Sequence, residues 1–226
     1  HRDLHSFPTR CSSDLHIVFI GDGLADIFGI PYGWKSFDQR ADVTTDGYAA
    51  FANATYHFAD RWAATLGGRY TYEQKDLNFQ QFDPNGLGFV PNIGPLSDDY
   101  SAGEFTPTAS LMYSLNPSWN LYATYSSGYK SGGFNVDVLS TANNIGFDAE
   151  RVDNFELGAK AVLFDGRAQA NLAVFYMDYK DLQVTQYDPA TFSNYIGNAA
   201  SASVTGIEFD LVAYMEIGRA SCRERV

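Results

Sequence analysis

Residues that could carry out catalytic chemistry are scarce in this chain of 226 residues. Outside the two terminal segments described below, His16 and His57 are the only histidines. That leaves no choice of base for a Ser-His-Asp triad and no histidine-rich metal site. The glycines of SSGYKSGGF lack the G-x-x-x-x-G-K-[ST] spacing of a phosphate-binding loop, and they follow a strand pattern. We therefore predict that the protein is not an enzyme and has no catalytic residue, no metal site and no cofactor.

Charged and amide side chains instead recur at alternate positions of extended stretches. The set comprises Arg69, Glu73, Lys130, Glu156, Lys160, Arg167, Gln169, Asn171 and Glu208. Charges at this density need water or ionic partners. A wide barrel with a polar lumen supplies both more readily than a narrow barrel filled with its own side chains. The candidate ligand contacts in such a lumen are Arg69, Glu73, Lys130, Glu156 and Lys160.

Two pairs of ionisable residues are closely spaced in the sequence. Glu156 precedes Lys160, and Glu208 precedes Asp210, each pair on one face of a predicted strand. Paired carboxylates can perform general acid and base chemistry. Cross-strand ion pairing that fixes the register is the favoured interpretation in a polar lumen.

A second group of candidates is aromatic and lies in the first long connection. Phe79, Phe82, Phe89 and Tyr100 are able to stack on a planar or aromatic ligand, and anchoring of the loop itself is the alternative role. The same region carries Asp83, Asp98, Asp99 and Glu104. These carboxylates do not favour the steering of an anionic ligand.

The hydrophobic pattern that must position these residues has a period of two, as strands require. In WAATLGGRYTYEQKD, residues 62–76, every second residue is apolar or small. No run of 18 apolar residues exists, so the sequence predicts no membrane-spanning helix. The last strand is expected to bend or bulge at Gly206. Seven strands are predicted, at about residues 45–58, 62–76, 104–115, 119–130, 152–163, 167–182 and 195–213.

The connections between these strands alternate between short and long. Short turns are expected near 59–61, 116–118 and 165–166, and long loops at about 79–102, 131–150 and 185–194. An up-and-down antiparallel sheet places all the short turns at one rim, as in bacterial outer-membrane barrels. Tryptophans adjoin the short turns and tyrosines the opposite ends of the apolar faces, which indicates two aromatic belts. The alternative is a soluble β-sandwich, whose strands are usually shorter than those that cross a membrane.

The two ends of the chain differ from its middle. Both cysteines, Cys11 and Cys222, and five of the 15 Lys and Arg residues lie in the first fifteen or last eleven positions, whereas every tyrosine lies between them. HRDLHSFPTRCSSDL and IGRASCRERV resemble translated sequencing-adapter sequence. We therefore interpret residues 1–15 and 216–226 as non-native tails and residues 16–215 as the native domain.

Longer segments resemble the C-terminal β-barrel of TonB-dependent outer-membrane receptors. The resemblance spans most of residues 41–215, although Ala149-Glu150 stands where the family often has Pro-Glu. The family's plug domain, the segment that binds TonB and the final strand have no counterpart here. The matching segments are YAAFANATYHFADRWAATLGGRYTYEQKD, FTPTASLMYSLNPSWNLYATYSSGYKSGGFN, ERVDNFELGAKAVLFDGRAQANLAVFYMDYKDLQV and ASVTGIEFDL.

This resemblance implies an all-β fold, an antiparallel up-and-down transmembrane β-barrel of which about seven strands out of 22 are present. It also implies active import across the bacterial outer membrane of a scarce ligand, most often a ferric siderophore. The expected partners are outer-membrane lipid, the ligand and the TonB complex, which acts through the plug domain, and no nucleic acid is expected. A passive porin-like channel, an outer-membrane adhesin and a soluble carbohydrate-binding β-sandwich remain alternatives.

Overall fold

The computed structural model describes residues 9–20, 35–84, 91–136, 145–189 and 193–213. These residues form strands and no helix, so no described helix is long and apolar enough to cross a membrane. The strands are β1 (Thr9–Ile20), β2 (Lys35–Phe58), β3 (Trp62–Phe82), β4 (Ile93–Asn116), β5 (Trp119–Lys130), β6 (Gly133–Phe134), β7 (Gly146–Phe147), β8 (Glu150–Leu163), β9 (Ala168–Asp188) and β10 (Ser193–Ala213).

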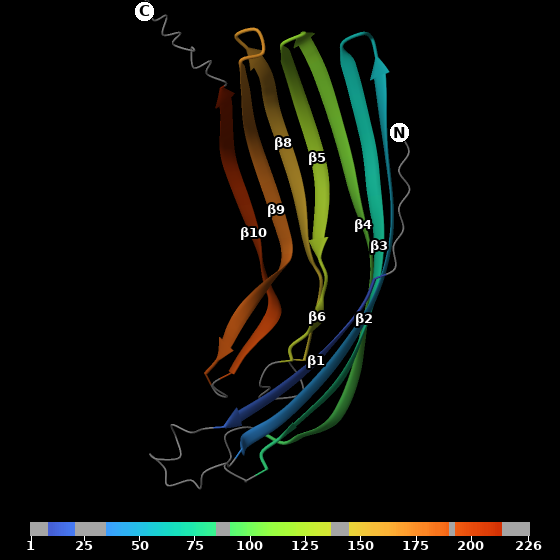
Figure 1. The fold of residues 1–226 in the computed structure, drawn as a ribbon, viewed down its shortest axis with the longest axis vertical. Helices are drawn as coiled ribbons and strands as arrows, with labels where there is room; N and C mark the ends of the chain where they lie inside the picture. The colour runs from blue at the N-terminus through green and yellow to red at the C-terminus, as the bar shows by residue number, and fades with distance from the viewer. Residues whose placement is uncertain (1–8, 21–34, 85–90, 137–144, 190–192, 214–226) are drawn as a thin grey trace, which may run out of the picture.

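Eight strands form one antiparallel sheet in the order β1-β2-β3-β4-β5-β8-β9-β10, and β6 pairs only with β7. Neighbours in the chain are therefore neighbours in the sheet, which Figure 1 shows as a long curved wall. The predicted all-β, antiparallel up-and-down fold is confirmed, as a part of a barrel that does not close within this chain. The seven predicted strands correspond to β2, β3, β4, β5, β8, β9 and β10.

The remaining strands were not predicted. β1 pairs with β2 from Thr9 opposite Gly47 to Ile20 opposite Lys35, so it includes part of the predicted non-native tail. Main-chain hydrogen bonds between strands do not depend on side-chain identity. The tail boundaries at residues 15 and 216 stay predictions.

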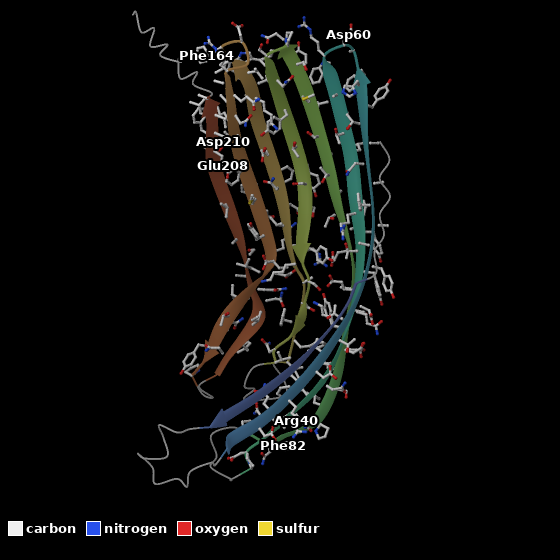
Figure 2. The ribbon with its side chains drawn as sticks, viewed as in Figure 1. Arg40, Asp60, Phe82, Phe164, Glu208 and Asp210 are labelled. Atoms are coloured by element: carbon white, nitrogen blue, oxygen red, sulfur yellow. The ribbon has the colours of Figure 1, made fainter. Side chains whose placement is uncertain are left out.

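The short turns lie at one end of the sheet, as the alternation of connection lengths predicts. Figure 2 shows Asp60 and Phe164 at this end and Arg40 and Phe82 at the other. Asp60 follows Ala59, and both have positive φ, of 52° and 51°. Two consecutive positive φ angles are typical of a type I′ turn, whose twist matches that of the strands it joins.

One face of the sheet near these turns is apolar and unshielded. Leu66, Phe105 and Leu157 are each more than 60% exposed, and all point to this outer face. At the turn end, the rings of Phe58 and Trp62 stack with centroids 6.3 Å apart, and the Tyr113 ring packs against Trp62 at a tilt, at 4.6 Å. We call this apolar part of the outer face the apolar band. At its border away from the short turns, the rings of Tyr125 and Phe155 pack with their centroids 5.1 Å apart.

The apolar face switches sides further along the same strands. β2 has 24 residues, or about 80 Å at roughly 3.3 Å per residue, whereas the apolar band of an outer-membrane barrel is about 25 Å tall. Beyond the band, the apolar residues Ala41, Leu77 and Phe79 point to the inner face and are at most 4% exposed. Strand β2 therefore begins at Lys35 and not at the predicted residue 45. In this additional part, apolar residues such as Ala41 lie on the inner face instead of the outer face.

Gly206 does not mark the irregularity that was expected in the last strand. Residues 202–213 pair with β9 without interruption, and the register shifts lie between Asn198 and Ala202. The prediction of a bend or bulge at Gly206 is therefore wrong. The Phe175 ring lies across Gly206 from the paired strand, so a larger side chain would collide with it. The glycine accommodates a neighbouring aromatic ring in a regular ladder.

Candidate ligand passage and its mouth

The inner face near the short turns is lined by hydroxyl, amide and charged groups. A cavity of about 390 Å³ lies there, bordered by His57, Tyr122, Glu156 and Lys160 among others. The Tyr122 hydroxyl donates to Glu156 Oε1 at 2.6 Å, and Lys160 Nζ lies 5.3 Å from the Tyr122 ring centroid. Glu156 and Lys160 therefore meet through Tyr122 between them.

A second cavity lies further along the inner face, about halfway between the short turns and the opposite end of the sheet. It measures about 280 Å³ and is bordered by Asn53, Arg69, Thr106 and Thr108, among others. Arg69 Nε donates to Thr71 Oγ1 at 3.0 Å. This bond leaves the rest of the guanidinium to face the polar side of the sheet, where a guanidinium is suited to anionic oxygen ligands.

Lys75 lies further than Arg69 from the short turns, on the same face of β3, and its side chain binds residues 131 and 132, which follow β5. Its ammonium group donates to Ser131 Oγ at 3.0 Å and to the Gly132 carbonyl at 2.6 Å. The Glu73 carboxylate lies 3.7 Å away. Tyr100 contributes from β4: its ring centroid is 5.7 Å from Lys75 Nζ, and its hydroxyl accepts a bond from Gly132 N.

The connection from β5 to β8 folds over the inner face. We name its described parts, residues 131–136 and 145–149, the inner strap. Phe134, Val136 and Ile145 of the inner strap pack against Leu77 and other apolar residues of β2, β3 and β4. This small hydrophobic core explains why the apolar residues of β2 and β3 face inward beyond the band: the inner strap covers them.

Polar contacts tie the inner strap to both sides of the sheet. On one side, Gln39 Nε2 of β2 donates to the Val136 carbonyl at 2.5 Å. On the other side, Gln183 Nε2 of β9 donates to the carbonyls of Ser131 and Asp148, each at 3.0 Å. Asn198 of β10 pairs with the Asp148 main chain through both its oxygen and its nitrogen.

An ion pair lies at the level of the strap and joins β4 to β8. Arg151 donates from Nε to Glu104 Oε2 at 3.1 Å and from Nη2 to Glu104 Oε1. This two-bond contact raises the pKa of the Arg151 guanidinium. The pair links the two strands that flank β5, beyond the point where β4 and β5 cease to pair at Thr108 and Ser126.

The aromatic candidates occupy different environments. Phe79 is 2% exposed in the core beneath the inner strap, and Tyr100 contacts Gly132 and Lys75, so both serve to anchor loop structure. Phe82 is 37% exposed at the end of β3. Phe89 lies outside the described residues. Their role in ligand stacking stays a prediction.

The lumen candidates also separate into groups. Arg69, Glu73, Glu156 and Lys160 face the inner side, as the alternation predicts. Lys130 is exposed at the end of β5. Glu208 and Asp210 lie on β10, two positions apart in its pairing with β9 (Figure 2).

We call the long-loop end of the sheet, opposite the short turns, the mouth. Sequence reasoning missed three residues whose contacts hold the structure together there: Lys75, Gln183 and Arg151. Along β3 the apolar residues occupy even positions before Lys75 and odd positions after it. This change in the sequence pattern is the signal that could have identified Lys75. Gln183 and Arg151 carry no comparable pattern. Their partners lie 30 or more residues away in the chain.

The described residues contain no group of three or more His, Cys, Asp or Glu side chains that could hold a metal ion. The inner face offers hydroxyls, amides and charges of both signs, whereas the outer face offers hydrocarbon between two aromatic borders. A sheet with these two faces forms the wall of an outer-membrane-type β-barrel.

The family follows from a match over most of the chain. The chain belongs to the family described as TonB dependent receptor-like, beta-barrel, whose family model matches residues 14–219. This is a family of outer-membrane transport receptors of Gram-negative bacteria and not of enzymes.

Curated relatives and solved structures agree with this assignment. The chain is 29% identical over 169 residues to the pesticin receptor of Yersinia pestis, a match that covers 74% of this chain and 24% of the relative. It is 24% identical to the ferric-pyoverdine BN7/BN8 receptor of Pseudomonas putida, over 76% of this chain and 19% of the relative. The chain thus spans about a quarter or less of the length of these relatives.

The fold is similar to that of the ferric yersiniabactin uptake receptor FyuA from Yersinia pestis. The TM-score is 0.72 at 21% identity, and the alignment covers 94% of this chain and 29% of the receptor. This likeness supports the fold: the sheet corresponds to part of the wall of a receptor barrel.

Proposed function

We propose that the full-length protein that carries this chain is an outer-membrane receptor that binds a ferric siderophore and imports it with energy relayed by TonB. The observation that carries the proposal is a barrel wall of the receptor family whose inner face is polar from the short-turn end to Lys75, where the apolar outer face ends. Relatives named as receptors for ferric pyoverdine and as a ferric yersiniabactin uptake receptor support the substrate class.

The inner-face residues have distinct roles in this proposal. Arg69 borders the cavity halfway up the wall, where its guanidinium is suited to an anionic ligand oxygen. Lys130 and Phe82 are exposed at the mouth and are suited to a first contact with ligand. Glu73 steadies Lys75, and Glu156 with Lys160 lines the passage near the short-turn end.

The test is iron uptake by cells that lack siderophore receptors of their own and produce the full-length protein. Radioiron-labelled ferric yersiniabactin and ferric pyoverdine are supplied separately, in strains with and without TonB. We expect saturable uptake of at least one complex that disappears without TonB. Uptake that persists without TonB would indicate a porin-like channel, and surface binding without uptake in either strain would indicate an adhesin.

Localisation is tested on the same cells. The protein is expected in the outer-membrane fraction, with a gel mobility that changes on heating, as folded barrels show. Recovery in the soluble fraction would contradict the proposal. The described strands already disfavour a soluble β-sandwich, because eight of them lie in one sheet.

A further inference from the structure

The outer face of the sheet is hollowed within the apolar band. The hollow measures about 710 Å³ and extends from β3 to β10. Ala64, Ala109 and Ala123 line it, and their small side chains leave the space that the larger Leu66 and Leu157 border. The lining is mostly apolar, so the hollow suits a hydrocarbon chain.

Strands β4 and β5 part beside this hollow. Their last pair toward the mouth, apart from the turn, is Thr108 opposite Ser126, whereas β3 stays paired with β4, and β5 with β8, to the ends of β4 and β5. We call the unpaired stretch between β4 and β5 the seam. Ala109 and Tyr125, which adjoin the last pair, both line the hollow, so the seam begins at the edge of the hollow.

The inner cavity that Arg69 borders reaches into the seam. Thr106 and Thr108 of β4 and Ser127 of β5 border this cavity together with Arg69. Side chains alternate along a strand, which places Ser127 on the same outer face of β5 as Tyr125. The cavity therefore extends through the seam toward the outer face, where Tyr125 lines the hollow.

An ion pair bounds the seam on the side of the mouth. Arg151 of β8 bonds the Glu104 carboxylate of β4, so the contact crosses the seam. Glu104 and Thr108, which mark the two ends, are about 13 Å apart along β4 at roughly 3.3 Å per residue. The seam is thus a window of limited length, with a polar cavity on its inner side and a hydrocarbon hollow on its outer side.

The charge in the cavity selects the sign of the group that would bind there. Among the described residues, the Arg69 guanidinium bonds the Thr71 hydroxyl at 3.0 Å and pairs with no carboxylate. Its remaining N–H groups are able to donate to oxygens of an anion, for which the planar guanidinium is well suited.

We propose that the window is a side-entry site for an anionic ligand with an acyl chain, whose chain lies in the hollow and whose head reaches Arg69 through the seam. An anion without a chain would leave the hollow unused, and a chain without an anionic head would not engage Arg69. The acyl chain also holds such a ligand in the outer leaflet, from which the hollow is reached directly. The inference rests on the proposed function, because it names the class of ferric siderophore: one that carries an acyl chain.

The experiment uses the purified full-length protein in lipid vesicles, with palmitate that carries a diazirine at the far end of its chain. Light attaches the probe to the residues that its chain contacts, and peptide mass spectrometry locates them. We expect saturable labelling at residues 123–125 and 155–157, which line the hollow. Hexadecanol with the same diazirine has no anionic head, and it should label these residues no more than the rest of the apolar band.

Removal of the cation tests the head of the site. Arg69→Gln should lower the labelling of the hollow by palmitate about tenfold, because it removes a charged hydrogen-bond donor. The matched control Arg167→Gln removes a guanidinium at the short-turn end, where it bonds the Phe164 carbonyl, and should leave the labelling unchanged. Heat-modifiable gel mobility verifies that each variant folds.

Filling the hollow tests the position of the chain. Ala123→Leu should lower the labelling about fivefold, because the added side chain occupies the space of the probe. Ala159→Leu adds the same volume on the same face, at a position that does not line the hollow, and should have little effect.

Three results would overturn the side-entry site. They are equal labelling by palmitate and by the alcohol, labelling that Arg69→Gln leaves unchanged, or equal effects of Ala123→Leu and Ala159→Leu. Radioiron uptake of ferric yersiniabactin and ferric pyoverdine is measured separately in cells. Absence of TonB-dependent uptake while the labelling pattern holds would count against the proposed function and leave the site standing.

Discussion

The two halves of strands β2 and β3 place their apolar residues on opposite sides. Near the short turns Leu66 points outward and is 66% exposed, whereas toward the mouth Leu77 points inward and is 1% exposed. The pairing of β2 with β3 runs without a register shift from Asp38 opposite Phe82 to Phe58 opposite Trp62. Because no bulge reverses the strand, the change of side lies in the amino-acid pattern itself.

The difference shows that one strand can serve two solvents. We call the half near the short turns, drawn at the top of Figure 1, the lower half, and the other the upper half. In an outer-membrane barrel the outer face of the lower half would contact lipid, which accounts for its apolar outer face and its polar inner face. In the upper half, water lies outside and the inner strap supplies the core within. Lys75 lies where the two halves meet. It is on the inner face of β3, and its ammonium group bonds the inner strap at Ser131 and Gly132.

The largest effect is expected from Leu77→Ala in the upper half. Loss of a buried leucine side chain costs about 2–5 kcal/mol, which should loosen the inner strap and leave the lower half intact. Hydrogen exchange of the strap amides in the full-length protein measures this. Asn78→Ala, at an exposed neighbour on the outer face, is the control and should change exchange little. Equal effects of the two substitutions would break the comparison.

The next effect is expected from Leu66→Arg in the lower half. A cationic side chain on the lipid face costs about 2–4 kcal/mol near the middle of the bilayer. Thr65→Arg, one position along and on the wet face, should cost much less, although it removes the 2.9 Å bond between the Thr65 and Thr55 hydroxyls. Urea titration of the full-length protein in lipid vesicles compares the two. A larger loss with Thr65→Arg would reverse the assignment of the faces.

The smallest effect is expected at the upper border of the band, where Asp153 lies two residues beyond Phe155. Lys180 Nζ and the Tyr125 hydroxyl, at 3.0 and 2.9 Å, hold the pKa of Asp153 below its usual 3.8. A lowered folded-state pKa gives stability that is present above the unfolded value and lost as pH falls through the folded one.

Thermal unfolding of the full-length protein should therefore show a small loss of stability below about pH 4 that the Asp153→Asn variant lacks. The loss should be a fraction of the two effects above, because Lys180 is 55% exposed and water screens the pair. An unchanged pH profile in Asp153→Asn would show that this border pair contributes nothing.

Period-two alternation predicted the lower halves well, because lipid on one side and water on the other impose it on every strand. The same rule also placed Arg69, Glu156 and Lys160 on the inner face. It could not predict the upper halves, where a loop distant in sequence covers the inner face. Nothing in the sequence near Phe79 indicates that its ring is buried, because Phe134 and Ile145, which pack in the same core, come from that loop. Gly206 misled for a similar reason, since the Phe175 ring that lies across it belongs to another strand.

The most direct test of this account is a scan of nitroxide labels along β3, residues 62–82, in the full-length protein in a lipid bilayer. We expect collision with a lipid-soluble relaxant to peak at even positions up to Tyr72 and then to cease. Beyond Lys75, even positions should instead meet a water-soluble relaxant, while positions 77, 79 and 81 stay protected from both. Lipid contact that continues at even positions through Phe82, or odd positions that stay wet throughout, would contradict the change of side.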